Sequence, residues 1–328
     1  ILIGLVGSEM CIRDSIYTVY AQKKYIRCIA VMCKTVFWGG RRMISLSGVN
    51  KRLGSFRLKD ISIEIPDGYI CALVGQNASG KTTLIKMILG LCRPDDGTVV
   101  IDGLNYQEAE SDKRIRDITG IVPVNELMNS GLSLLENGRC YGRFYSRYDE
   151  SIYMEYLERF GLDRKIKFGK LSKGQKIKAP FAFVLSTDPK YLILDEPTAG
   201  LDVIAREELL EMLREFLEKD EERSILISSH ISSDLESLCD ELYMIHDGKI
   251  ILHEDTDVLL SDYALLKVDA EQYSKLDKQF ILRSKKETYG YSCLTNQKQY
   301  YMENYPKIAI EKGTIDEVIT MMIRGIEQ

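Results

Sequence analysis

The chain has 328 residues, of which 45% are hydrophobic and 28% charged, as is ordinary for a soluble globular protein of one large domain with an appendage, or of two modest domains. The formal net charge of −5 lacks the basic excess typical of nucleic-acid binders, so we expect no nucleic-acid partner. No uncharged apolar run reaches about 18 residues, which predicts that the chain contains no transmembrane helix.

Residues 1–42 differ from the rest in charge and pattern. They carry a net charge of +5 against −10 for residues 43–328. The opening apolar stretch has its positive charges after it rather than before it, which is the reverse of a secretory signal. We interpret residues 1–42 as a non-native leader or artefact, with Met43 as the natural start. A genuine targeting segment is the alternative.

A phosphate-binding loop is predicted between a strand and a helix. The apolar run Tyr69–Val74 indicates a buried strand, and apolar residues at helical spacing follow from Leu84. Between them lies Gly-Gln-Asn-Ala-Ser-Gly-Lys-Thr-Thr, which matches the P-loop pattern G-x-x-x-x-G-K-[ST] in the context that this motif requires. Its glycines let backbone N–H groups surround phosphate oxygens. The residues expected to bind nucleotide are Gly75, Asn77, Gly80, Lys81, Thr82 and Thr83.

A second buried strand, Tyr191–Asp195, ends in two acidic residues. Asp195 is expected beside the P-loop, where it and the Thr82 hydroxyl would hold Mg²⁺. Glu196 would point elsewhere, in a position to orient or deprotonate the attacking water. Lys81 would supply its charge to the β- and γ-phosphates.

Three further segments complete a recognisable set: Leu-Ser-Lys-Gly-Gln at 171–175, Ala-Gly-Leu-Asp at 199–202 and Ser-Ser-His at 228–230. In this order, together with the P-loop, they resemble the ATP-binding cassette (ABC) ATPases over residues 43–253. The resemblance implies an α/β P-loop fold: a RecA-like core, an antiparallel β subdomain and a helical subdomain at about 124–172 that faces a membrane partner. The cassette would span residues 43–254.

The same resemblance implies roles for residues outside the P-loop. Two ATPase subunits, identical or different, would form a head-to-tail dimer, in which the signature of one closes over ATP bound to the other. His230 would be the switch residue that contacts the γ-phosphate and water. The residues expected to reach the nucleotide from these segments are Ser172, Gly174, Gln175 and Asp202.

Beyond the motifs, the spacing of apolar residues predicts a helix at 205–217, and Asp247-Gly248 predicts a two-residue hairpin turn. Residues 255–328 are expected to form a small α+β tail of unknown role. The tail contains a tyrosine-rich segment, for which a place in the core of the tail is favoured over a binding surface. The scattered cysteines, without C-x-x-C spacing, indicate buried apolar side chains rather than a metal or disulfide framework.

Three positions depart from the family pattern. Leu53 replaces the aromatic residue that stacks on adenine, and Phe56 could substitute for it. Val124-Asn-Glu stands where the family has a glutamine that contacts Mg²⁺ and the membrane partner. Pro180 lies inside the helix after the signature and is expected to kink it.

The sequence thus predicts an ATP-binding and ATP-hydrolysing subunit of an ABC transporter. It would use ATP and Mg²⁺, lie at the cytoplasmic face of the membrane and power a separately encoded integral membrane permease. The pattern looks most like bacterial exporters of the multidrug or antibiotic type. The alternatives are a soluble ABC-type ATPase and a regulatory nucleotide-binding module that hardly hydrolyses ATP.

Overall fold

A computed structural model describes residues 43–105, 111–123, 128–199, 201–229, 236 and 238–327. Contacts divide the chain into two compact units, residues 1–41 and residues 42–328, and every described residue belongs to the second. Among the described helices, none combines the length and the apolar character needed to cross a bilayer.

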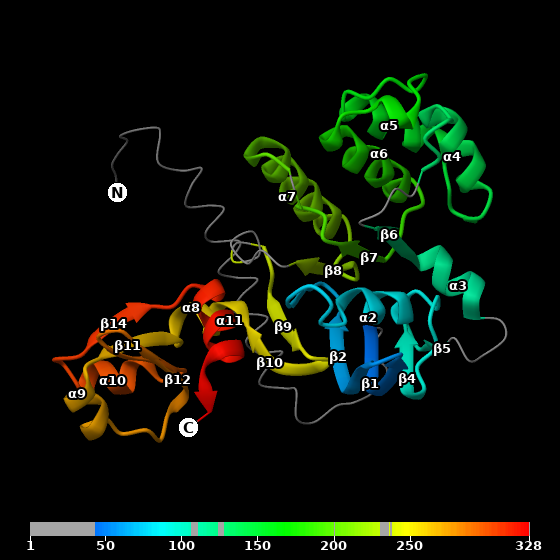
Figure 1. The fold of residues 1–328 in the computed structure, drawn as a ribbon. Helices are drawn as coiled ribbons and strands as arrows, with labels where there is room; N and C mark the ends of the chain where they lie inside the picture. Colours follow the sequence, from blue (N-terminus) through cyan, green and yellow to red (C-terminus); the bar gives the residue numbers. More distant parts are fainter. Residues whose placement is uncertain are drawn as a thin grey trace, which may run out of the picture. The chain divides into compact units, whose positions relative to one another are not determined.

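A six-stranded sheet, in the order β10-β9-β3-β8-β7-β6, forms the centre of this unit (Figure 1). Its parallel strands are β3 (Ile70–Val74), β6 (Thr119–Val122), β7 (Tyr191–Asp195), β8 (Ser224–Ser229) and β9 (Glu241–His246). Strand β10 (Lys249–Asp255) is antiparallel to β9. Because β3, β7 and β8 run in the same direction, the P-loop, Asp195 and Ser229 all lie at one edge of the sheet, the place where α/β proteins bind ligands.

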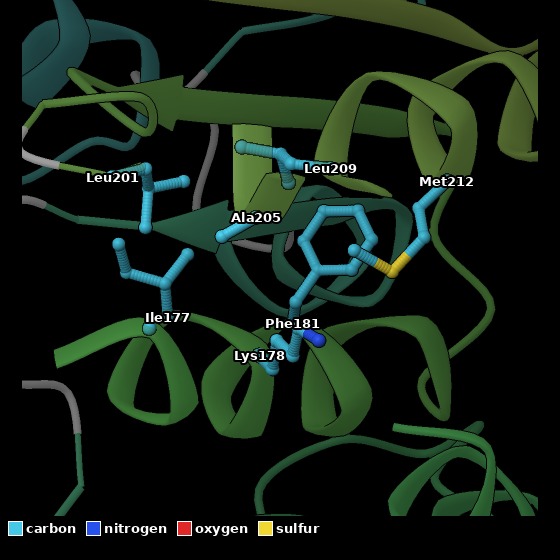
Figure 2. Close-up of a pocket in the computed structure, with 8 residues that line it drawn as sticks. Ile177, Lys178, Phe181, Leu201, Ala205, Leu209 and Met212 are labelled. Atoms are coloured by element: carbon cyan, nitrogen blue, oxygen red, sulfur yellow. The ribbon is translucent and has the colours of Figure 1, made fainter. Parts of the chain in front are cut away.

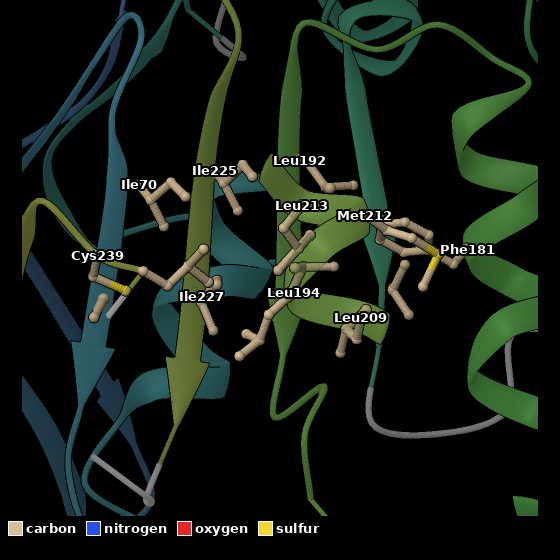
Figure 3. Packing of buried hydrophobic residues seen from close by; sticks show 14 of the residues in the cluster. Ile70, Phe181, Leu192, Leu194, Leu209, Met212, Leu213, Ile225, Ile227 and Cys239 are labelled. Atoms are coloured by element: carbon tan, nitrogen blue, oxygen red, sulfur yellow. The ribbon is translucent and has the colours of Figure 1, made fainter. Parts of the chain in front are cut away.

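Both faces of the central strands are buried: β3, β7 and β8 are buried at every position, and their residues are mostly apolar. On one face, alternate residues of the strands pack against α6 (Lys173–Leu185) and α7 (Val203–Glu218). Figure 3 shows Leu194 and Ile227 directed toward Leu209 and Leu213 of α7. The other face packs against α2 (Lys81–Ile88) and a second sheet. The central sheet therefore lies between two packed layers, and the P-loop follows the carboxyl end of its strand β3.

The second sheet is antiparallel, in the order β2-β1-β4-β5. It consists of β1 (Met43–Leu53), β2 (Phe56–Pro66), β4 (Asp96–Ile101) and β5 (Leu104–Asn105). Its inward-facing residues, among them Ile44 and Ile61, share a core with α2. The predicted antiparallel β subdomain is thus present and packs against the helix that follows the P-loop.

The β9–β10 hairpin forms as predicted, with Asp247 and Gly248 as its two-residue turn. Both residues have positive φ (44° and 72°), which is the type I′ geometry that Asp-Gly favours. Gly248 donates its N–H to the Ser79 carbonyl (3.2 Å) and accepts from the Lys59 N–H (2.8 Å). The turn therefore fastens the P-loop to β2.

Between β4 and β9 the chain adds helices around the central sheet. These are α3 (Ser111–Ile118), α4 (Leu134–Gly142), α5 (Glu150–Arg159), the short 3₁₀ helix η1 (Phe168–Lys170), α6 and α7. Helix α4 begins with a capping box formed by Ser133 and Glu136. Pro180 does not end α6, which continues to Leu185. Within the region at about 124–172 where a helical subdomain was predicted, the described residues 128–172 form α4, α5 and η1. The helix predicted at 205–217 extends by two residues at its start and one at its end.

The C-terminal tail adds a five-stranded antiparallel sheet in the order β14-β11-β13-β12-β15. Its elements are α8 (Thr256–Ser261), β11 (Ala264–Val268), α9 (Ala270–Lys275), β12 (Ile281–Glu287), β13 (Gly290–Thr295), α10 (Lys298–Asn304), β14 (Ala309–Lys312), α11 (Ile315–Arg324) and β15 (Ile326–Glu327). The tail is thus α+β, as predicted. Tyr301 is fully buried in a core to which Tyr291, Tyr300 and Tyr305 contribute, whereas Tyr289 is exposed.

Candidate nucleotide-binding site

The loop between β3 and α2 can form only with glycine at two positions. Gly80 has φ 119°, a conformation that side chains disfavour. A Cβ at Gly80 would lie 2.5 Å from Leu58 Cδ2, and one at Gly75 would collide with the Ile245 carbonyl and lie 2.7 Å from Ser79 Oγ. The loop therefore closes against β2 and β9, and its exposed part, residues 76–78, includes Asn77. Such a loop can bring N–H groups up to a phosphate.

Lys81 begins α2, and its side chain is directed into this loop. Its Nζ donates to the Gly75 carbonyl (2.6 Å) and the Gln76 carbonyl (3.3 Å). It also lies 3.2 Å from Glu196 Oε1, with the lysine side chain only 6% exposed and that of Glu196 13%. A buried ammonium is thus held at the centre of the P-loop, paired with the carboxylate that follows β7.

Two oxygen-bearing side chains meet next to this lysine. Thr82 Oγ1 donates to Asp195 Oδ2 at 3.2 Å, so the hydroxyl at the start of α2 touches the carboxylate at the end of β7. The other carboxylate oxygen, Oδ1, accepts from Ser228 Oγ. Carboxylate and hydroxyl oxygens are the ligands of a hard cation such as Mg²⁺. The pair therefore fits the predicted metal position.

Ser228 has a bridging position that sequence reasoning missed. Besides donating to Asp195, its hydroxyl accepts from the Glu196 backbone N–H at 3.0 Å. The bridge arises because Asp195 and Ser228 are direct neighbours in the register of β7 and β8. A polar residue at the carboxyl end of the otherwise apolar run Ile225–Ile227 was the available signal. One hydroxyl thus contacts both the Asp195 carboxylate and the Glu196 backbone.

Glu196 and Asp195 point in different directions although they are adjacent in the chain. Glu196 has φ 50°, which is uncommon for a residue other than glycine. This turn of the backbone directs Glu196 toward Lys81, while Asp195 contacts Thr82 and Ser228. Left-handed strain at such a residue costs on the order of 1 kcal/mol and is typical of functional sites.

The signature segment forms the start of α6, and Asp202 forms the start of α7. Ser172 is the N-cap of α6: its hydroxyl accepts from the Gln175 N–H (3.3 Å), and Gln175 Oε1 accepts from the Ser172 N–H (3.0 Å). Gly174 has open space where a Cβ would be. Asp202 caps α7 by accepting from the Ala205 N–H (2.8 Å). The start of α6 thus offers backbone donors next to an exposed serine.

These two helices pack against each other through apolar side chains. Figure 2 shows Ile177 and Phe181 of α6 facing Leu201, Ala205 and Met212 across a small pocket. An ion pair between Lys178 and Glu208 (2.5 Å) also joins the helices. The signature and Asp202 are therefore fixed relative to each other, as the ends of two packed helices.

Comparison with known proteins decides the family. Residues 58–199 match the family model described as ABC transporter. The ABC transporter ATP-binding protein NatA of Bacillus subtilis (strain 168) is 33% identical over 226 residues, covering 64% of this chain and 88% of NatA. The lantibiotic transport ATP-binding protein SrtF of Streptococcus pyogenes is 34% identical over 218 residues, covering 66% of this chain and 92% of SrtF.

The chain belongs to the ABC transporter ATP-binding family.

A solved structure supports the same assignment: a dimeric ATP-binding cassette in a post-hydrolysis state, bound to ADP and Pi, matches with a TM-score of 0.59 at 25% identity. The match covers 65% of this chain and 99% of that cassette. The predicted family and α/β P-loop fold are confirmed, as are ATP binding and ATPase activity as the function of this cassette.

Within this ABC cassette, the signature residues at the start of α6 and the residues of the P-loop form two separate groups. In the part of the chain that the structure describes, no hydrogen bond or ion pair joins Ser172, Gly174 or Gln175 to the P-loop. The proposed switch residue His230 and the Val124–Glu126 stretch lie outside the described residues. Thr83, which follows Thr82 in α2, is half-buried.

Phe56 is the aromatic side chain at the edge of the cassette's P-loop. It is the cross-strand partner of Leu53 at the end of the β1–β2 hairpin. Its Cζ would lie 3.2 Å from a Cβ placed on Gly80, so the ring reaches the loop. Leu53 is 44% exposed. Phe56 is half-buried, which leaves part of its ring open to solvent.

Proposed function

We propose that residues 43–254 of this chain bind ATP with Mg²⁺, hydrolyse it at an interface with a second cassette, and thereby drive a separately encoded membrane permease. The observation that carries the chemistry is the arrangement around β7: Asp195 touches Thr82, and Glu196 touches Lys81. Asp195 and Thr82 supply oxygens for Mg²⁺, whereas Lys81 places its ammonium group beside Glu196, the proposed base. Together they match the needs of phosphoryl transfer to water.

ATP would replace the present partners of Lys81. Its Nζ now bonds to two loop carbonyls and Glu196. A β- or γ-phosphate oxygen is a stronger acceptor than a carbonyl, so Lys81 would turn to the phosphates and release Glu196. Glu196 would then be free to orient or deprotonate water, with His230 contacting the γ-phosphate. Nucleotide binding would thus release Glu196 from Lys81, so that it can act as the base.

Mg²⁺ would be held by the Thr82 hydroxyl and Asp195, either directly or through water. When bound, it neutralises charge on the β- and γ-phosphates. Ser228 would keep the Asp195 carboxylate oriented. We expect phosphate release by the purified chain to fall to background when EDTA removes divalent cations, and to return when Mg²⁺ is restored. Turnover unaffected by EDTA would contradict this proposal.

The composite site would form head to tail between two cassettes. The support is that, among the described residues, no hydrogen bond or ion pair joins Ser172 or the start of α6 to the P-loop of the same chain. The hydroxyl and the backbone N–H groups there are donors suited to a phosphate. The structurally similar cassette bound to ADP and Pi is itself dimeric. The partner cassette would be a second copy of this chain or a related subunit.

Coupling to a membrane permease is proposed from the family and from the relatives' names. NatA is named as an ABC transporter subunit, and SrtF is named for lantibiotic transport. We infer an exporter whose ATPase subunit lies at the cytoplasmic face of the membrane. A multi-helix membrane protein encoded by a neighbouring gene should co-purify with this chain. With an affinity tag on the permease alone, retention of this chain on the affinity column would support the coupling. Failure of this chain to bind would argue against it.

Adenine recognition is assigned to Phe56. Replacement by Ala should raise the Kd for ATP about fivefold to tenfold, because a stacked ring contributes on the order of 1 kcal/mol. Leu53→Ala, at the cross-strand neighbour, is the matched control and should change the Kd less. Fluorescence titration with an ATP analogue measures both. Equal effects of the two replacements on the Kd would contradict a role of Phe56 in adenine binding.

A further inference from the structure

Ser228, near the carboxyl end of β8, contacts the neighbouring strand with both its backbone and its side chain. It is fully buried, at 0% exposed, and is the register partner of Asp195 in β7. The backbone N–H of Glu196, one residue beyond β7, donates to the Ser228 carbonyl (3.1 Å) and to the Ser228 hydroxyl (3.0 Å). The hydroxyl proton is directed elsewhere, because Ser228 Oγ donates to Asp195 Oδ1. One buried side chain thus contacts the residues on both sides of the peptide bond that joins the two acids.

The bond to Glu196 lies at a turn of the backbone that needs support. Glu196 has φ 50°, a left-handed conformation that a residue with a side chain keeps only when its surroundings hold it there. The φ angle describes rotation about the bond from the backbone nitrogen to Cα, and the two Ser228 oxygens fix the direction of the N–H on that nitrogen. In this conformation the Glu196 carboxylate lies 3.2 Å from Lys81 Nζ. A backbone that returned to an extended conformation would move this carboxylate.

The opposite end of β8 has a serine that provides a comparison. Ser224, the first residue of β8, is 1% exposed and pairs in register with Tyr191 at the start of β7. Its hydroxyl donates to the Pro66 carbonyl (2.8 Å), a backbone group at the end of β2. Because β7 and β8 are parallel, Ser224 lies at the edge of the sheet opposite to the P-loop. The two serines therefore share strand, burial and a hydrogen-bonded hydroxyl, but only Ser228 contacts the acids.

We propose that Ser228 is a positioning residue for ATP hydrolysis, whose hydroxyl holds the left-handed turn at Glu196 and thereby keeps the base directed toward the nucleotide site. This proposal rests on the role given to Glu196 under the proposed function, and it goes beyond the orientation of Asp195. The Ser228 hydroxyl bonds to the two acids rather than to the P-loop. Its loss should therefore reduce kcat and leave KM for ATP unchanged.

The test compares three variants of the full chain. Ser228→Ala removes the hydroxyl and should lower kcat about tenfold, the order expected from loss of one buried hydrogen bond that acts on the transition state. Ser228→Thr keeps the hydroxyl and should restore most of the rate. Ser224→Ala removes the comparison hydroxyl, and it should lower the melting temperature about as much as Ser228→Ala does without lowering kcat. An equal loss of kcat in Ser224→Ala would overturn the proposal.

A titration with Mg²⁺ separates the two contacts of the Ser228 hydroxyl. If the hydroxyl acted only through Asp195, Ser228→Ala would need more Mg²⁺ for half-maximal turnover, and saturating Mg²⁺ would restore the wild-type kcat. If the hydroxyl holds Glu196, kcat stays about tenfold low at saturating Mg²⁺. Restoration of kcat by Mg²⁺ would contradict the proposal, as would a folded Ser228→Thr variant that turns over as slowly as Ser228→Ala.

A further measurement, independent of turnover, is hydrogen exchange of the peptide that covers residues 191–199, without nucleotide. Ser228→Ala should speed exchange in this peptide relative to wild type, because the Glu196 N–H loses one of its two acceptors, whereas Ser228→Thr should not. Unchanged exchange in Ser228→Ala would show that the hydroxyl does not hold the turn, and the proposal would be wrong. If the wild-type chain shows no turnover at all, the proposed function fails. The exchange result still decides whether Ser228 holds the backbone at Glu196.

Discussion

Replacing Glu196 with Gln is expected to reduce ATP hydrolysis roughly a hundredfold or more, the usual contribution of a general base, while ATP still binds. Glutamine keeps the shape of the side chain and the backbone bond to Ser228, but it cannot accept a proton. The release of phosphate by purified protein, measured at saturating ATP, reports the loss. A matched control is Glu218→Gln, at an exposed position at the end of α7, which should hydrolyse at the wild-type rate.

The Glu196→Gln variant should bind ATP at least as tightly as the wild type. The Glu196 carboxylate lies 3.2 Å from Lys81 Nζ and would compete with phosphate for that ammonium. The glutamine amide of the variant would be a weaker competitor, because a neutral amide attracts a cation less than a carboxylate does. With ATP bound and not consumed, the dimer should accumulate, which size-exclusion chromatography detects as an ATP-dependent shift.

The outcome also separates the proposed function from its rival. If the wild type hydrolyses ATP no faster than Glu196→Gln, the chain is a nucleotide-binding module and the proposed catalytic role of Glu196 is wrong. If the variant loses ATP binding together with turnover, Glu196 acts mainly by organising Lys81. Only a loss of turnover with retained binding agrees with a base.

Replacing Lys81 with Met is expected to weaken ATP binding by about 100-fold, because it removes the charge-assisted contacts to the phosphates that are worth roughly 3 kcal/mol together. Methionine preserves much of the buried aliphatic volume, which matters because the lysine side chain is only 6% exposed. Isothermal titration of the full chain with a non-hydrolysable ATP analogue measures the change.

The control for this prediction lies on the same helix. Lys86→Met changes an exposed lysine of α2 and should leave the affinity for ATP unaltered. Circular dichroism should show the same secondary structure for both variants, so that a loss of affinity is not a loss of fold. Wild-type affinity in Lys81→Met would mean that this loop does not hold the phosphates.

Residue types and spacing alone were sufficient to predict the local elements of the nucleotide site. The P-loop lies within one short stretch, and strand β7 with its two acids lies within another, so residue types and spacing were enough to predict them. The pairing of Asp195 with Thr82 followed from the rule that parallel strands end at one edge of a sheet. The Asp-Gly turn at 247–248 likewise followed from its preference for positive φ.

The contacts between these stretches could not be predicted from local sequence patterns. The bridge from Ser228 to both acids depends on the register of β7 and β8, and no local pattern sets the register of two strands so far apart in the chain. The contact of Lys81 with Glu196 depends on the left-handed backbone at Glu196, which an apolar strand ending in two acids does not reveal. The hydrogen bond that the Glu236 carboxylate accepts from the Ile315 N–H, at the start of α11, joins residues that are also distant in sequence. Such contacts arise from packing the whole core, because a side chain meets its partner only after both elements are buried.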